Sequence, residues 1–351
     1  MISTPPALTL ALGLLFACPL SGSPAPRADV QQQADSAPAP AVVSSPTVEE
    51  TYLTVTRGED LLDLLIPRNE TLTFEARLGL GVIEAEVGTV TLSSRVVPYR
   101  ASLLGGGGGE SGGETGSITA RATGGYTVYE LDSTLETRFQ PTAWPAMIHR
   151  MTQAGTEKRR RETLVGTDAG KPRTTYRSDT RHGAPSGTRI WRPAEEVDAP
   201  VGVVDSLGGV FLVRTMLREG VDSVEVPVLD KDRVWNVTIS LGESETIETG
   251  AGVFQARPVL LETTRRDVQE SDDEEFSGPF GIKGDIRLWV EESTGVPVVI
   301  AGTLPAGPLE IDLDIRLTSF EGCPEGFAGP GGLPIEAAAD SVEETPEPDA
   351  D

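Results

Sequence analysis

A strict alternation of apolar and charged residues near the C-terminal end most constrains how this chain can fold. Between residues 309 and 317, five apolar residues alternate with four charged ones, namely Leu309, Ile311, Leu313, Ile315 and Leu317 with Glu310, Asp312, Asp314 and Arg316. A period of two is typical of a strand with one buried face, and a shift of one residue would move all four charges into the core. Because the other face stays in water, we expect an antiparallel sheet.

The same alternation recurs along the chain and predicts a fold that is mainly β. Residues 71–77 and 83–87 alternate in this way, and the phase of the pattern changes at Gly88, as it does at a β-bulge. Two further runs, 224–228 and 235–241, flank a short polar turn and predict a hairpin. Altogether we expect roughly ten to twelve strands.

The middle of the chain is expected to add strands separated by long insertions. Strands are predicted at 125–139 and 143–152, and a hairpin over 156–180. The Gly-rich stretch 105–117 and the acidic stretch 267–281 interrupt the alternation. Both are predicted to be loops inserted between strands.

One segment favours a helix. Asp205 is a good N-cap residue, and five residues after it share one face of a helix of about twelve residues, namely Leu207, Val210, Phe211, Arg214 and Leu217. Arg214 therefore lies on an otherwise apolar face. It either pairs with a carboxylate for structural reasons or faces a ligand, and Asp205 and Arg214 are candidate residues for such an ion pair or ligand contact.

The N-terminal residues predict export. Residues 7–17 form an apolar run that is far shorter than the roughly 20 residues of a membrane-spanning helix, and residues 1–17 are typical of an export signal. The run ends in LFAC, which resembles the bacterial lipobox, whose cysteine, here Cys18, is acylated. The alternative is an ordinary cleaved signal in which Cys18 has no role.

Segments that cannot form a core flank the predicted domain. Residues 18–50 are rich in Pro, Ala and Ser and predict a tether. Residues 321–351 are rich in Gly and Pro and then acidic, and predict a disordered tail. With Cys18 acylated, the expected location is the periplasm, on a membrane, with the outer membrane favoured over the inner.

Four segments, in chain order, resemble the bacterial envelope family catalogued as domain of unknown function 3108: GEDLLDLLIPRNETLTFEARLGLGVIEAEVGTVTL, VVDSLGGVFLVRTM, VPVLDKDRVWNVTISLGESETIETGAGVFQA and IRLWVEESTGVPVVIAGTLPAGPLEIDL. The resemblance covers Leu64 to Leu317. It implies an exported, single β-rich domain, here residues 51–320, and no established activity. It also implies a strongly curved antiparallel sheet, half-open and barrel-like, with one short helix, similar to periplasmic lipid-carrier half-barrels.

The sequence offers little for catalysis. It contains two His and two Cys, and His149 and His182 stand in no metal-binding or triad motif. Cys323 would be the one thiol left after acylation, and a lone exported Cys is a candidate for reactivity. We therefore predict no catalytic residue, no metal and no cofactor, and an enzyme is the third of three hypotheses.

The distribution of charge supports one of the other two hypotheses. The net charge is −25, which disfavours nucleic acid as a partner, yet residues 149–192 carry 11 basic and 4 acidic side chains. Basic residues of this segment form either a solvated strand face or a docking surface, which we call the candidate docking stripe. It comprises Lys158, Arg159, Arg160, Arg161, Arg173 and Arg177. The first hypothesis is a binding module for a hydrophobic or amphipathic ligand. The alternative is an envelope assembly protein that docks an acidic partner through this stripe.

Overall fold

The computed structural model describes residues 51–58, 60–80, 83–98, 113–126, 129–140, 146–156, 158–168, 171–179, 190–266, 275–306, 309–324 and 326–327. All of them belong to one compact unit. The strands are β1 (Tyr52–Val55), β2 (Leu64–Pro67), β3 (Asn69–Leu80), β4 (Ile83–Pro98), β5 (Glu114–Tyr126), β6 (Tyr129–Gln140), β7 (Ala146–Gly155), β8 (Arg159–Asp168), β9 (Lys171–Ser178), β10 (Glu195–Val197), β11 (Val204–Asp205), β12 (Ser223–Asp230), β13 (Arg233–Leu241), β14 (Glu245–Thr249), β15 (Gly252–Arg265), β16 (Lys283–Glu291), β17 (Pro297–Ala306) and β18 (Leu309–Glu321). The helices are α2 (Ser206–Glu219) and the 3₁₀-helix η3 (Pro279–Gly281).

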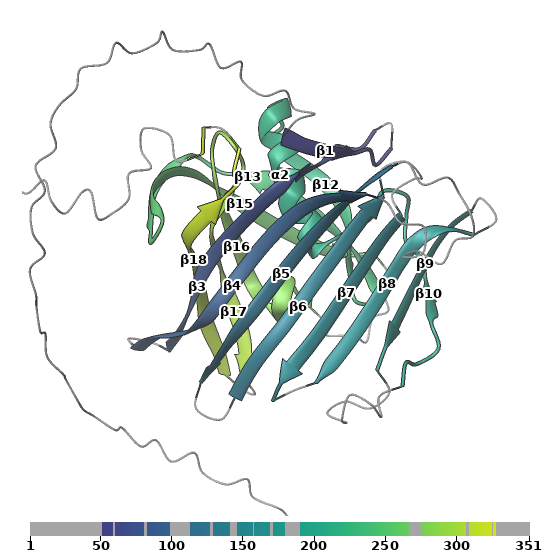
Figure 1. Ribbon diagram of the computed structural model, residues 1–351, viewed down its shortest axis with the longest axis horizontal. Helices are drawn as coiled ribbons and strands as arrows, with labels where there is room; N and C mark the ends of the chain where they lie inside the picture. The colour runs from purple at the N-terminus through teal and green to yellow at the C-terminus, as the bar shows by residue number, and fades with distance from the viewer. Residues whose placement is uncertain are drawn as a thin grey trace, which may run out of the picture. The chain divides into compact units, whose positions relative to one another are not determined.

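One large sheet contains 16 of the strands, in the order β10-β9-β8-β7-β6-β5-β4-β3-β18-β17-β16-β15-β13-β12-β11, with β14 paired to β15 (Figure 1). Neighbouring strands are antiparallel except β11 and β12, which are parallel. Strands β1 and β2 pair separately. Among the described strands, β10 and β11 each pair on one side, so the sheet is not closed.

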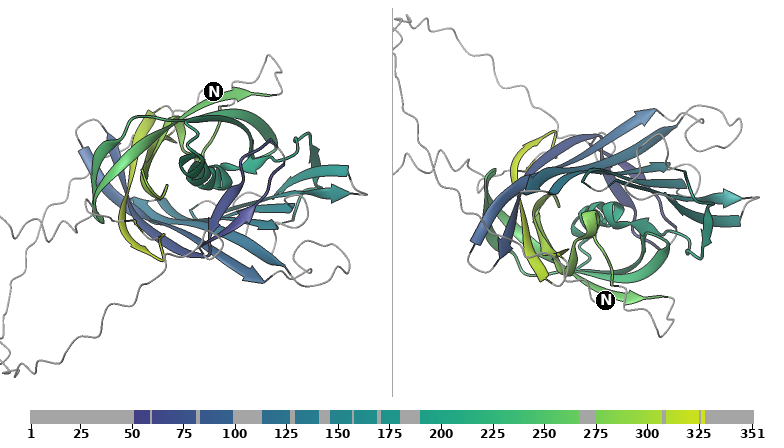
Figure 2. Two further views of the ribbon diagram at one scale, coloured as in Figure 1. Left: turned by 90° about the horizontal axis from the view of Figure 1, so that it is seen from above. Right: turned by 90° about the horizontal axis from the view of Figure 1, so that it is seen from below.

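The sheet curls around α2, as the views from above and below show (Figure 2). Asp205 caps the helix, because its carboxylate accepts the backbone N–H of Gly208 at 2.9 Å. At the other end, Gly220 adopts a left-handed conformation with φ of 65°, which ends the helix. The predicted helix is thus confirmed. The predicted fold, a mainly β, strongly curved antiparallel sheet with one short helix, is confirmed as well.

The strand patterns behave as expected from the sequence. In β18, Leu313, Ile315 and Leu317 are buried, whereas Asp312 and Arg316 are exposed. The bulge predicted at Gly88 is confirmed. Ala76 pairs with Gly88 while Arg77 pairs with Glu86, so one residue of β4 between these two pairs has no partner on β3. The predicted hairpin is also confirmed by β12 and β13.

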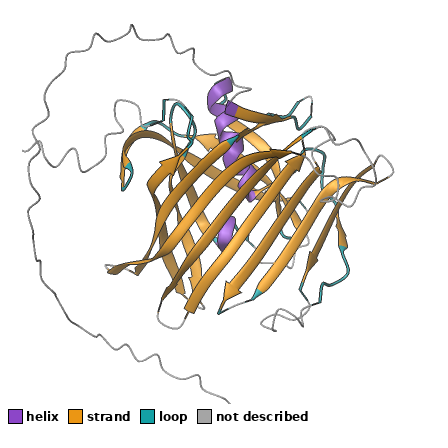
Figure 3. Ribbon diagram, viewed as in Figure 1, coloured by secondary structure: helices purple, strands orange, loops and turns teal. Residues whose placement is uncertain are grey.

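The predicted insertions and the strand count need correction. Strand β5 begins at Glu114, inside the predicted loop 105–117. The described end of the predicted loop 267–281 enters the interior, where Ser277 is 6% exposed and the adjoining Ile282 is 1% exposed. Figure 3 shows η3 as the second, smaller helical segment within the curve of the sheet. The 18 described strands exceed the expected ten to twelve, because two to four residues, as in β2, β10 and β11, are too few to show a period.

None of the described helices combines the length and apolar character that crossing a membrane requires.

Candidate ligand-binding site

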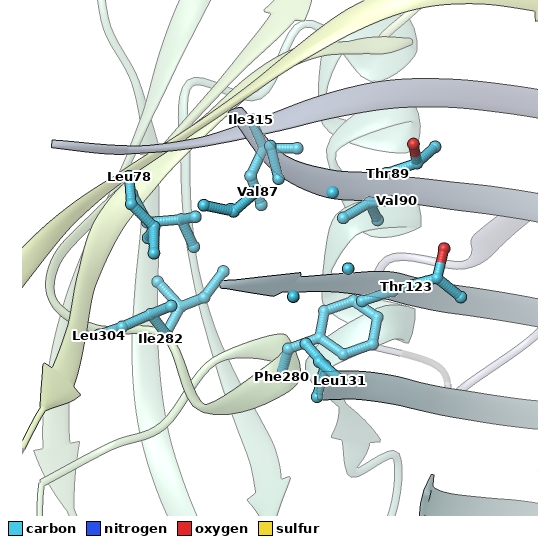
Figure 4. A pocket seen from close by; sticks show the side chains of 16 residues that line it. Leu78, Val87, Thr89, Val90, Thr123, Leu131, Phe280, Ile282, Leu304 and Ile315 are labelled. Carbon is cyan, nitrogen blue, oxygen red and sulfur yellow. The ribbon is translucent and has the colours of Figure 1, made fainter. Parts of the chain in front are cut away.

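An apolar cavity lies on the inner side of the sheet; we call it the sheet cavity. Its volume is about 130 Å³. The residues that form it come from β3, β4, β5, β6, β17, β18 and the η3 segment (Figure 4), and include Leu78, Val87, Val90, Leu131, Phe280, Ile282, Leu304 and Ile315. Among all lining residues only Thr89 and Thr123 have polar side chains. The cavity therefore offers hydrocarbon contacts and almost no hydrogen bonds.

Two glycines at the bulge line the sheet cavity. Gly88 pairs with Gly124 across β4 and β5, and both residues line the cavity. A β-carbon on Gly88 would lie 2.7 Å from the Cα of Gly124, and one on Gly124 would lie 2.8 Å from the Cα of Gly88. The two strands thus approach too closely for a side chain at either position.

A second apolar cavity, which we call the helix cavity, lies beside α2. Its volume is about 80 Å³, and its lining includes Val210 and Val213 of α2, Phe276 and Pro279 from the segment around η3, and Ile239 of β13. The segment 276–282 contributes lining residues to both apolar cavities. It therefore acts as a wall between them.

A polar pocket, which we call the cationic pocket, adjoins the same wall. Its volume is about 260 Å³. Its titratable lining residues are His149, Arg159, Arg161, Tyr176, Asp230, Lys231 and Lys283. Burial raises the pKa of the Tyr176 phenol, so this hydroxyl stays protonated and is able to donate a hydrogen bond.

His149 is held in place by a buried carboxylate. Its Nδ1 lies 2.5 Å from Oδ2 of Asp205 and 2.9 Å from Oγ1 of Thr137, which itself donates to Asp205. An ionised carboxylate accepts hydrogen bonds and donates none, so Nδ1 carries the proton and Nε2 is the ring nitrogen left for other contacts. Burial alone would raise the pKa of Asp205, but the charge and hydrogen bond of His149, with those from Thr137 and Gly208, hold it below its ordinary value.

Arg214 lies in a buried ion pair. Its Nη2 is 2.7 Å from Oε1 of Glu70, and the two side chains are 2% and 1% exposed. Burial alone would lower the pKa of Arg214, but Glu70 raises it above its ordinary value. The pair joins α2 to β3, and the phenol of Tyr52 and the thiol of Cys323 adjoin it. None of the three cavities is lined by Arg214.

The candidate docking stripe divides between the two faces of the sheet. Arg159 and Arg161 line the cationic pocket on the inner face. On the outer face, Arg160 pairs with Asp179 at 2.8 Å, Arg177 pairs with Glu162, and Arg173 is exposed with Glu196 at 3.9 Å. The ring of Trp191 lies 4.3 Å and 4.5 Å from the guanidinium carbons of Arg160 and Arg177. Lys158 is half-buried. The alternation of a strand explains this division.

Comparison with protein families assigns the chain to one of them. The family described as protein of unknown function DUF3108 matches residues 115–314. The chain belongs to the DUF3108 family. The expected resemblance is thereby confirmed, over a shorter range than Leu64 to Leu317. No curated protein matches the chain.

A solved structure is also similar to this DUF3108 protein. It is described as a β-barrel-like protein of domain of unknown function DUF1849 from Brucella abortus, and it is 11% identical with a TM-score of 0.43. The alignment covers 72% of this chain and 97% of that chain.

Three features considered from the sequence of this DUF3108 protein lie outside the described residues, namely the predicted acylation site Cys18, the residue His182, and the acidic stretch before residue 275. In the part of the chain that the structure describes, no three His, Cys, Asp or Glu side chains cluster so that they could hold a metal ion. Sequence reasoning missed His149 as a wall of the cationic pocket. Its signal is the alternation of Met147, His149 and Met151 along β7, which places all three on one face.

Proposed function

We propose that this DUF3108 domain binds a hydrophobic or amphipathic ligand in the sheet cavity and does so without catalysis. The observation that supports the proposal is the sheet cavity itself. About 130 Å³ is several times the roughly 10–15 Å³ that one water molecule requires. Water there would find almost no hydrogen-bond partners, whereas each methylene buried there would gain about 0.8 kcal/mol.

Binding of a fluorescent fatty acid tests the proposal. Dansyl-labelled undecanoic acid, titrated into the purified protein, is expected to brighten as its chain leaves water. The substitution Leu304→Trp places a larger side chain, an indole ring, in the sheet cavity. It is expected to weaken binding about tenfold or more, because the hydrocarbon chain of the fatty acid then buries several methylenes fewer. Leu78→Trp fills the cavity from β3 and serves as a second blocking variant.

The matched control is Leu260→Trp. Leu260 is 47% exposed and lines none of the three cavities, so the same substitution there should leave binding unchanged. Circular dichroism and thermal melting must show that all the variants fold. If the wild-type protein gives no fluorescence change, or if the three variants bind equally well, the proposal is wrong. A hydrolytic activity lost in His149→Asn would contradict the absence of catalysis.

We also propose that the protein is exported to the periplasm and held at a membrane by acylation of Cys18. The sequence LFAC and the tether that follows support this. Cells fed radioactive palmitate should label the wild-type protein and not Cys18→Ser. Equal labelling of both would contradict the anchor, and no labelling of either would favour an ordinary cleaved signal.

Docking of an acidic partner remains the second candidate function. Arg173 is exposed at the outer face and favours it, whereas the ion pairs of Arg160 and Arg177 leave less positive charge there. A pull-down from envelope extract that Arg173→Glu abolishes would support this candidate.

A further inference from the structure

The cationic pocket concentrates positive charge in an acidic protein. Four basic residues line it, Arg159, Arg161, Lys231 and Lys283, against one acidic residue, Asp230. The chain as a whole carries a net charge of −25. Asp230 accepts the backbone N–H of Ser277 at 3.1 Å and lies 3.8 Å from Nζ of Lys231, so part of the local charge is balanced. Lys283 likewise lies 3.9 Å from Oε2 of Glu275. Among the residues that line the pocket, basic side chains still outnumber acidic ones.

The cationic pocket and the apolar cavities share a wall. Phe280 lines both the cationic pocket and the sheet cavity, and Gly278 and Pro279 line both the cationic pocket and the helix cavity. A molecule whose polar end lies in the cationic pocket would therefore have an apolar compartment directly beside it, across Phe280 or Pro279. This arrangement matches an amphiphile and not a wholly apolar ligand.

Two features of this junction favour a binding role. Phe280 has φ of 60° and ψ of 12°, a left-handed conformation that is costly for a bulky residue and that concentrates at functional sites. His149, whose Nδ1 is committed to the buried Asp205, enters the pocket lining with its ring orientation fixed.

We propose that the cationic pocket binds the anionic headgroup of the ligand whose chain occupies the apolar cavity beyond Phe280, so that the ligand is an anionic lipid. This inference rests on the proposed function. Arg161 and Arg159 contact the headgroup, and a guanidinium suits either a carboxylate or a phosphate.

The test compares an anionic probe with its uncharged form. Dansyl-labelled undecanoic acid and its methyl ester carry the same chain, and the wild-type protein should bind the acid about tenfold more tightly, as expected for a hydrogen bond to a charged group. Arg161→Gln should remove this preference and leave binding of the ester unchanged. Arg159→Gln provides a second variant in case the first does not fold.

Arg173→Gln is the matched control, because Arg173 lies on the same pair of strands but on the outer face, and it should keep the preference. Equal binding of acid and ester by the wild-type protein would overturn the inference and leave the proposed function standing. Binding of neither would overturn both. A preference that persists in both pocket variants would also overturn the inference.

Displacement of the bound probe separates the two sources of an anionic headgroup. Lysophosphatidylglycerol and palmitate both carry a negative charge, whereas lysophosphatidylcholine has no net charge. Both anions should displace the probe from the wild-type protein more strongly than lysophosphatidylcholine does. Stronger displacement by lysophosphatidylglycerol would identify the headgroup as a phosphate, and stronger displacement by palmitate would identify it as a carboxylate. Equal displacement by all three would contradict the inference.

Discussion

Asp205 serves two structures with one carboxylate. Its Oδ1 caps α2 through Gly208, and its Oδ2 holds His149. Asp205→Asn retains an oxygen for the cap, since Asn is as good a cap as Asp, and removes the charge. We expect a loss of about 1.5–3 kcal/mol at neutral pH, typical of hydrogen bonds to a charged group, measured as the free energy of unfolding in urea.

The pH dependence of this loss has a definite sign. The folded protein holds the pKa of Asp205 below its ordinary value, so the stabilisation is fully present above the unfolded pKa and disappears as the pH falls through the folded one. The gap between the wild-type protein and Asp205→Asn should therefore close in acid. The control is Asp222→Asn at an exposed pair with Arg257, where about 1 kcal/mol or less is at stake. A gap that stays constant in acid would show that the charge of Asp205 is not the cause.

Cys323 should react slowly. Burial, with the neighbouring Glu70, raises the pKa of its thiol well above the ordinary value, and only the thiolate is a nucleophile. In Cys18→Ser, which has no other cysteine, alkylation by iodoacetamide at mildly alkaline pH should be at least about tenfold slower than in the same protein unfolded in urea. Equal rates in the folded and unfolded protein would contradict this.

At the scale of single residues, the sequence predicts contacts that are local and misses those that are not. Asp205 is recognisable as a cap because its partner is three residues away. Its contact with His149, and the contact of Arg214 with Glu70, depend on strands that the chain brings together from distant positions. No period or motif encodes those distances.

At the scale of elements, the glycine pair of β4 and β5 makes the sharpest prediction. Gly88→Ala and Gly124→Ala would each force a methyl group against the backbone of the neighbouring strand. Overpacking of this kind costs about 1–3 kcal/mol, so the midpoint of urea unfolding should fall in both variants. Gly166→Ala in β8 is the matched control, because nothing lies within 4 Å of its added carbon, and it should change stability by no more than about 0.5 kcal/mol.

Equal stability of the alanine variants would contradict this role of the glycines. If all three alanine variants unfold at the same urea concentration, the glycines are not needed for the close approach of β4 and β5.

The period-two pattern predicts long strands such as β18 well, because each has many residues facing the core. It misses η3, since a chain that turns inward between strands has no period, and acidic composition alone suggests an exposed loop.

At the scale of the whole molecule, β18 joins the two halves of the sheet. It pairs with β17 on one side and with β3 on the other. It also buries Leu313, Ile315 and Leu317, worth about 1.5–3 kcal/mol each, a sum comparable to the whole stability of a domain, about 5–15 kcal/mol. A chain that ends at Ala306 should therefore show no cooperative unfolding in urea.

The control is a chain that ends at Phe327, which retains β18 and the ring of Phe327 stacked 5.2 Å from Phe254. It should unfold like the full chain. A cooperative transition in the shorter chain at an unchanged midpoint would show that each half of the sheet is stable alone.

The sequence predicts the curved sheet through the family resemblance, but strand order at this junction is a long-range property that alternation does not encode.

The junction of β3 and β18 has a consequence for the order of events in the cell. Thr318 donates a hydrogen bond to the carbonyl oxygen of Thr73 at 3.0 Å, across 245 residues of chain. During synthesis β3 is made early and its partner almost last, so every new molecule passes through a period in which this edge is open. Pairings of such separation form slowly, and an open edge is able to pair with another chain. Newly made copies are thus exposed to aggregation in the interval between the synthesis of β3 and the pairing of β18 with it.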